Sequence, residues 1–143
     1  MKNLLQISTI DIDPNATDAI IDWLDADNTT KIPHGAEDGY YLYLDKPYRT
    51  ANQTFKSPST LRLGEGFEDA AKMNALLPFL CAIDDFTAIN VNTAPAEVLI
   101  SIDSNLSASD AEMIIAARDS QPFETINDFL ALGSLSSKIT DQK

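Results

Sequence analysis

Apolar residues recur at helical spacing in several short stretches of the chain. In residues 13–25, Ala16, Ile20 and Trp23 fall on one helical face, after an Asp-Pro pair that is typical of a helix start. Other stretches combine similar spacing with a capping residue, a Pro or a Gly at one end: 57–64, 68–77, 95–100, 107–118 and 125–132. The pattern predicts a mainly α chain built from short helices.

The stretches between these helices set the expected organisation. Residues 26–57 carry Gly and Pro without helical periodicity and predict a long irregular loop, while residues 88–91 predict a brief extended segment. We therefore expect a small multi-helix domain with few short strands. Its predicted parts are an acidic helical subdomain (1–87), a helix-hairpin-helix or SAM-like subdomain (88–133) and a frayed polar tail (134–143).

Charge and residue usage narrow the functional classes. The 143 residues include 22 acids and 10 bases, and the net charge of −12 disfavours phosphate backbones and anionic lipids as partners. The single cysteine, Cys81, excludes a disulfide framework and a thiolate zinc cluster, and its apolar neighbours predict a buried thiol. His34 is expected to be exposed, and the absence of familiar catalytic motifs predicts a protein that is not an enzyme.

Aromatic side chains are expected to pack rather than to bind. Trp23 is predicted to lie in the core, and the tyrosines are predicted to hold the long loop against the helices, because such a loop must bury something to stay ordered. The residues concerned are Tyr40, Tyr41, Tyr43 and Tyr48, with Phe79, Phe86, Phe123 and Phe129 expected in the core.

The acids concentrate in one region. Residues 11–45 hold nine acids and one lysine, and the sharpest cluster places Asp25 and Asp27 before a loop that leads to Glu37 and Asp38. Calcium takes about six to eight oxygen ligands, which carboxylates and loop carbonyls supply. The spacing does not match an EF-hand loop. The residue pattern therefore leaves two interpretations open: a calcium site, or a solvated acidic face that helps to cap a helix.

Residues 89–132 resemble the helix-hairpin-helix domains of DNA-uptake and repair proteins. In those domains a Gly-rich hairpin lets backbone amides approach a phosphate, whereas the corresponding turn here, residues 103–107, has no glycine. Residues 91–132 also carry seven acids against one base, Arg118. We expect the scaffold without the DNA site, and a structural role for Arg118. A helix-hairpin-helix nucleic-acid-binding module is the alternative function.

Four ordered segments extend the likeness: DWLDAD (22–27), GAEDGYY (35–41), PYRTAN (47–52) and INVNTA (89–94). Together they resemble protein K of bacterial type II secretion systems, a family of minor pseudopilins (GspK-like). The resemblance covers roughly residues 4–132. It implies the central helical domain of a periplasmic protein with an inner-membrane anchor, in contact with the minor pseudopilins I and J at the pseudopilus tip.

The resemblance also implies a metal and a mechanism. It indicates Ca²⁺ bound through Asp25, Asp27, Glu37 and Asp38, with Asp22 in reserve, so that the 25–38 loop is pinned and a docking surface is preorganised. The family's membrane helix, its cleavage motif and its late pilin strands have no counterpart in the sequence. The resemblance therefore implies an excised domain or a truncated gene product, without membrane contact or nucleic-acid binding.

Overall fold

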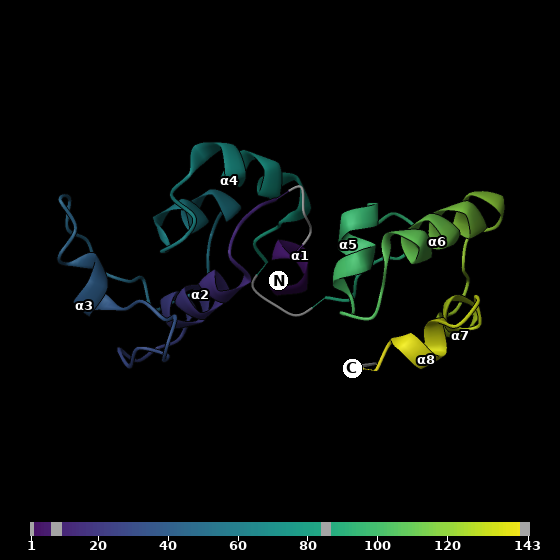
Figure 1. Ribbon diagram of the computed structural model, residues 1–143, viewed down its shortest axis with the longest axis horizontal. Coiled ribbons are helices and arrows are strands. Elements are labelled where there is room, and N and C mark those ends of the chain that lie inside the picture. The colour runs from purple at the N-terminus through teal and green to yellow at the C-terminus, as the bar shows by residue number, and fades with distance from the viewer. Residues whose placement is uncertain (1, 7–9, 84–86, 141–143) are drawn as a thin grey trace. The chain divides into compact units, whose positions relative to one another are not determined.

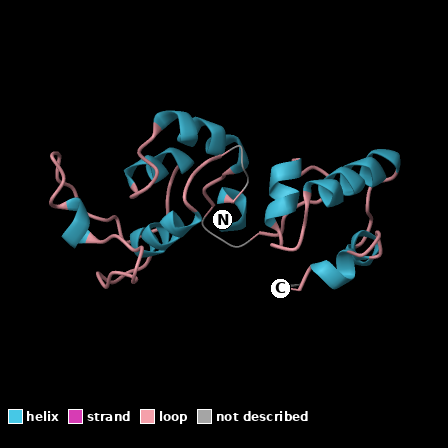
Figure 2. Ribbon diagram, viewed as in Figure 1, coloured by secondary structure: helices cyan, strands magenta, loops and turns pink. Residues whose placement is uncertain are grey.

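The computed structural model describes residues 2–6, 10–83 and 87–140, and all regular elements in these ranges are helices (Figures 1 and 2). The longest, α6, has 13 residues, and no helix among the described residues is long and apolar enough to cross a bilayer. The elements are α1 (Lys2–Leu5), η1 (Pro14–Ala16), α2 (Thr17–Leu24), α3 (Asp38–Tyr41), η2 (Pro58–Leu63), α4 (Ala70–Leu76), η3 (Leu77–Phe79), α5 (Ala96–Ser101), α6 (Ala108–Ser120), α7 (Ile126–Leu130) and α8 (Leu135–Lys138). The mainly α prediction is confirmed.

Beyond the first three residues, the chain divides into two compact units, residues 4–86 and 87–143, which we call the N-terminal unit and the C-terminal unit. In the N-terminal unit, the apolar face of α2 turns Ile20 toward a core that includes Phe67 and Met73. Asp13 caps the preceding turn by accepting a hydrogen bond from the Asn15 N–H at 2.8 Å, as the Asp-Pro start predicts.

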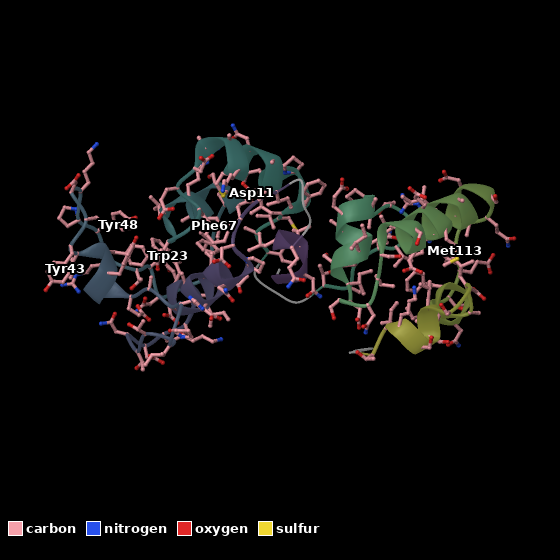
Figure 3. The ribbon with its side chains drawn as sticks, in the orientation of Figure 1. Asp11, Trp23, Tyr43, Tyr48, Phe67 and Met113 are labelled. Carbon is pink, nitrogen blue, oxygen red and sulfur yellow. The ribbon has the colours of Figure 1, made fainter. Side chains whose placement is uncertain are left out.

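A second cluster in the N-terminal unit is aromatic, and it confirms the core position of Trp23. The Trp23 and Tyr41 rings meet edge to face with centroids 5.2 Å apart, and Tyr48 stacks on Tyr41 at 5.3 Å. Figure 3 shows Tyr43 at the outer end of this unit, beyond Trp23 and Tyr48. Its side chain is 90% exposed and that of Tyr40 is 38% exposed, so the packing prediction holds for only part of the tyrosine set.

The C-terminal unit encloses a separate apolar cluster around Leu99, Ile114 and Phe129. Both predicted capping boxes are present, at the starts of α6 and α7. Gly133 follows α7 with φ +57°, a backbone conformation that favours glycine. Phe129 confirms one core prediction, Phe79 and Phe123 are half-buried at cluster edges, and Phe86 lies outside the described residues.

The predicted short strands are wrong for the described part of the chain. Residues 91–93 form a turn closed by bonds from the Thr93 and Ala94 N–H groups to the Asn90 carbonyl, and residues 88–90 are assigned to no strand. Arg118 donates to the carbonyls of Val91 and Ala94 at 2.8 and 2.7 Å. These bonds confirm the structural role expected of the arginine.

Two further expectations are wrong. The frayed polar tail from residue 134 instead begins with α8, because Leu135 and Ile139 are buried in the C-terminal core. The polar composition of residues 134–143 did not indicate that these two side chains are buried. Cys81 is exposed rather than buried, because the apolar run that ends the first unit leaves the core after η3. His34 is exposed, as predicted.

Candidate metal centre

The end of α2 brings two acids to the interior side of the N-terminal unit. Asp22 is 1% exposed, and Asp25 is the C-terminal cap residue of the helix. Because residues three apart share a helical face, both carboxylates lie on the side that the following loop covers. Trp23, packed against Tyr41, fixes the rotation of this helix end.

The loop returns over Asp22 through a close approach at Gly35. A Cβ on Gly35 would lie 2.1 Å from Asp22 Oδ2, so no larger residue fits without moving the turn. Lys31 N–H donates to the same oxygen at 3.0 Å, and Gly35 N–H donates to the Lys31 carbonyl at 2.6 Å. The carboxylate therefore anchors the turn that leads to Glu37.

Glu37 completes a group of three acids. It precedes α3 as the N-cap residue and is 2% exposed. One carboxylate oxygen from each of Asp22, Asp25 and Glu37 lies within 4.8 Å of the other two. Two oxygens bound to one calcium ion at about 2.4 Å can be at most about 5 Å apart, so the three can share one ion.

The group is short of hydrogen-bond donors and of positive charge. Glu37 Oε1 and Asp25 Oδ1 are buried without a partner among the described residues. Burial is the largest cause that raises the pKa of Glu37 above its ordinary value. A hydrogen bond from Thr50 lowers this pKa, and the charges of Asp22, Asp25 and Asp27 raise it further. Buried carboxylate oxygens without donors are costly by themselves and suit a cation.

The predicted ligands fall into two sets. Asp25 and Glu37 belong to the group, and the reserve residue Asp22 joins them. Asp27 is exposed, and its Oδ1 accepts a hydrogen bond from Thr29 N–H at 2.7 Å. Asp38 faces Arg49 and Thr50 of the following loop instead. Contributions of Asp27 and Asp38 to a metal site stay predictions.

Two residues that sequence reasoning did not single out lie beside these acids. The Thr50 hydroxyl lies 3.2 Å from both Glu37 Oε2 and Asp38 Oδ1, within hydrogen-bond distance of each. Asn52 donates to the Asp27 carbonyl at 2.9 Å, leaves its own Oδ1 buried and unpaired, and has φ +45°. Both belong to the PYRTAN segment of the family resemblance, which was the signal available for them.

The turn at residues 103–107, which the resemblance to helix-hairpin-helix domains predicts to be the hairpin, does not leave the amides of residues 105–107 free for a phosphate. The N–H groups of Asn105 and Leu106 donate to the side chain and the carbonyl of Asp103, at 2.9 and 3.1 Å. Ser107 N–H donates to Asp110 Oδ2 at 2.9 Å. The three amides that could approach a phosphate are already bonded, two of them to carboxylates.

Comparisons with known proteins place both units in one family. Residues 1–85 and 89–143 match two family models, each described as type II secretion system (T2SS), protein K. The chain is 40% identical to type II secretion system protein K of Pseudomonas aeruginosa over 112 residues, 78% of this chain and 33% of that protein. It is 35% identical to the Klebsiella pneumoniae protein over 124 residues, 83% of this chain and 37% of that protein.

The fold agrees with a solved structure. A chain in the crystal structure of the GspK–GspI–GspJ complex from the enterotoxigenic Escherichia coli type 2 secretion system superimposes with a TM-score of 0.72. The two are 24% identical, and the match covers 99% of this chain and 50% of that chain. This chain thus spans about a third of the length of the curated relatives. On the matches across both units, the chain belongs to the type II secretion system protein K family.

Proposed function

We propose that this chain is the helical domain of a minor pseudopilin and serves type II secretion as a structural component of the pseudopilus tip. The observation that carries the proposal is the match to protein K in both units. Placement in the periplasm, under an inner-membrane anchor, belongs to the same proposal. The role is non-catalytic, since the buried acids form a group suited to holding a cation rather than a substrate.

The proposed partners are the minor pseudopilins I and J of the same secretion system. A GspK–GspI–GspJ complex exists in enterotoxigenic E. coli, and a chain of that complex has the fold described here. Size-exclusion chromatography with light scattering tests the proposal on this chain and on purified proteins I and J. We expect a peak with the mass of all three chains, and none with an unrelated acidic protein in place of this chain. Separate elution in both calcium and chelator would refute the proposed contact.

We further propose that Asp22, Asp25 and Glu37 hold a calcium ion at the base of α3. Two of these carboxylates have a buried oxygen without a donor, and the oxygens are close enough to share one ion. When bound, calcium supplies the positive charge that this group lacks. The protein contributes the positions: α2 presents Asp22 and Asp25, and the turn at Gly35 brings Glu37 to them. The 25–38 loop is thereby fixed to the end of α2.

Thermal unfolding in calcium and in chelator tests the metal proposal. A ligand at about 100 times its Kd stabilises by about 2.7 kcal/mol, which corresponds to roughly 10 °C in Tm for a small domain. We expect a Tm shift of that size when unfolding is followed by the fluorescence of Trp23, the only tryptophan. Glu37→Gln should remove most of it, and the sequence predicts the same for Asp27→Ala. An exposed acid of the same unit, Asp45→Asn, is the matched control. Equal wild-type melting curves in calcium and chelator would refute the calcium centre.

A further inference from the structure

Two neighbouring acids, Glu37 and Asp38, have different partners. Asp38 Oδ2 pairs with the Arg49 guanidinium, and its Oδ1 accepts the Thr50 N–H at 3.1 Å. Glu37 has one side-chain donor among the described residues, the Thr50 hydroxyl at Oε2, while Oε1 has none. The protein therefore compensates the charge of Asp38 and leaves that of Glu37 uncompensated.

Thr50 is the residue that touches both acids. Its Oγ1 lies 3.2 Å from Glu37 Oε2 and 3.2 Å from Asp38 Oδ1, and a hydroxyl has a single proton to donate. Its backbone N–H is already held by Asp38, so the hydroxyl sits on a fixed point of the loop. We call Asp38, Arg49 and Thr50 the latch.

A fixed donor matters because of the length of the Glu37 side chain. A glutamate has three rotatable side-chain torsions, and burial alone does not choose the plane of its carboxylate. A hydrogen bond to Oε2 restricts that plane and leaves Oε1 as the buried oxygen available to a cation. Outer hydrogen-bond partners of this kind commonly change metal affinity by about 10- to 100-fold when removed.

We infer that Thr50 is a positioning residue for the calcium centre: through the latch, its hydroxyl aims the Glu37 carboxylate at the ion shared with Asp22 and Asp25. The inference rests on the proposed calcium centre. In this inference Asp38 belongs to the latch and does not bind the ion, and Arg49 and Thr50 of the following loop become part of the site.

Calcium titration of Thr50 variants tests the inference, with isothermal calorimetry for affinity and Trp23 fluorescence as a second signal. Thr50→Val removes the hydroxyl and keeps the backbone N–H. We expect its calcium affinity to fall about tenfold, and Thr50→Ser to return to within about threefold of wild type. Thr30→Val is the matched control, since Thr30 is exposed in the same unit and its side chain has no described hydrogen bond.

A purely structural role predicts a different result. It would lower Tm equally in calcium and in chelator and leave the affinity unchanged. Wild-type affinity in Thr50→Val therefore overturns the inference while the calcium centre stands, whereas absence of calcium binding in the wild type removes both. If Thr50→Val does not fold, Thr50→Ala replaces it, because alanine also has no side-chain donor and keeps the backbone N–H. Unchanged affinity in that variant is equally decisive.

Discussion

The two units bury acids in opposite ways. In the C-terminal unit, Asp103 and Asp110 are each 7% exposed and are surrounded by donors. Asp103 accepts bonds from Asn105 and Thr140, and Asp110 from Ser107 and Lys138. In the N-terminal unit, Glu37 is more deeply buried, and one of its oxygens has no donor. The C-terminal unit supplies donors to both of these buried carboxylates, whereas the N-terminal unit leaves one Glu37 oxygen without a donor among the described residues.

The pKa directions follow the same division. Hydrogen bonds from Lys138 and then Ser107 lower the pKa of Asp110 to about 2, and amide bonds from Asn105 and Thr140 lower the pKa of Asp103. Burial and neighbouring acids raise the pKa of Glu37. A lowered carboxyl pKa means that the folded state favours the charge, and a raised one means that it opposes the charge. The comparison separates acids that stabilise the fold from acids that suit a ligand.

Among the substitutions that test this comparison, we expect the largest change in the free energy of unfolding at Asp110. Asp110→Asn removes the ion pair that ties Lys138 of α8 to α6, at 2.7 Å, and weakens the capping box. We expect a loss of about 2 kcal/mol at pH 7, from one charged hydrogen bond and part of a cap. Hydrogen exchange of the α6 amides measures this loss within the C-terminal unit. Asp119→Asn, an exposed acid on the same helix, should cost little.

The pH dependence supplies the check on Asp110. Its pKa rises from about 2 in the folded state to 3.8 on unfolding, so its contribution is complete above 3.8 and disappears as pH falls through about 2. The difference between wild type and Asp110→Asn should therefore shrink between pH 4 and pH 2. A difference that stays constant over this range would contradict the assigned ion pair.

The residue pattern predicted the helix starts of the C-terminal unit better than it predicted the group of acids in the N-terminal unit. Capping at Ser107 and Thr125 involves residues three apart, so the pattern itself contains the interaction. α8 instead rests on long-range contacts that the polar composition of the tail did not indicate: Leu135 is buried in the C-terminal core, and Lys138 pairs with Asp110, 28 residues earlier. Contacts within one helical turn are readable from sequence, and those across the fold are not.

The same limit applies to the group of acids at the end of α2. Asp25 and Glu37 were identifiable because their segments resemble a known family, but whether Asp22 or Asp27 lies beside them depends on which carboxylate the loop covers. The loop covers Asp22, because Gly35 passes directly against it. α3 was unexpected because Gly39 lies inside it, and the burial of Tyr41 outweighs that weak helix propensity.

A smaller effect of opposite sign is expected at Glu37 in chelator. Glu37→Gln removes a buried charge that no donor satisfies at Oε1, so we expect a gain of about 1 kcal/mol at pH 7. Because the pKa of Glu37 is raised, protonation gives the wild type the same relief as pH falls toward 4.5, and the advantage of the variant should narrow. Denaturant unfolding, followed by Trp23 fluorescence, measures the gain at pH 7 and its decrease toward pH 4.5. A destabilised variant in chelator would mean that the charge is already satisfied.

The smallest effect is expected in the latch. Arg49 is 71% exposed at its side chain, so Arg49→Gln should cost only about 0.5 kcal/mol, and Asp38→Asn somewhat more because it also loses the charged acceptor of the Thr50 N–H. A double-mutant cycle in chelator, where calcium binding adds nothing, should give a coupling of about 0.5 kcal/mol.

The latch variants also distinguish the two possible uses of Asp38. If it were a calcium ligand, Asp38→Asn would abolish the calcium-dependent gain in Tm while Arg49→Gln, which frees the carboxylate, would keep or increase it. If Asp38 serves the latch, both variants should weaken calcium binding moderately and in parallel, through the loosened Thr50 hydroxyl. The acid whose charge the protein compensates would then support its neighbour, and the acid left uncompensated would hold the ion.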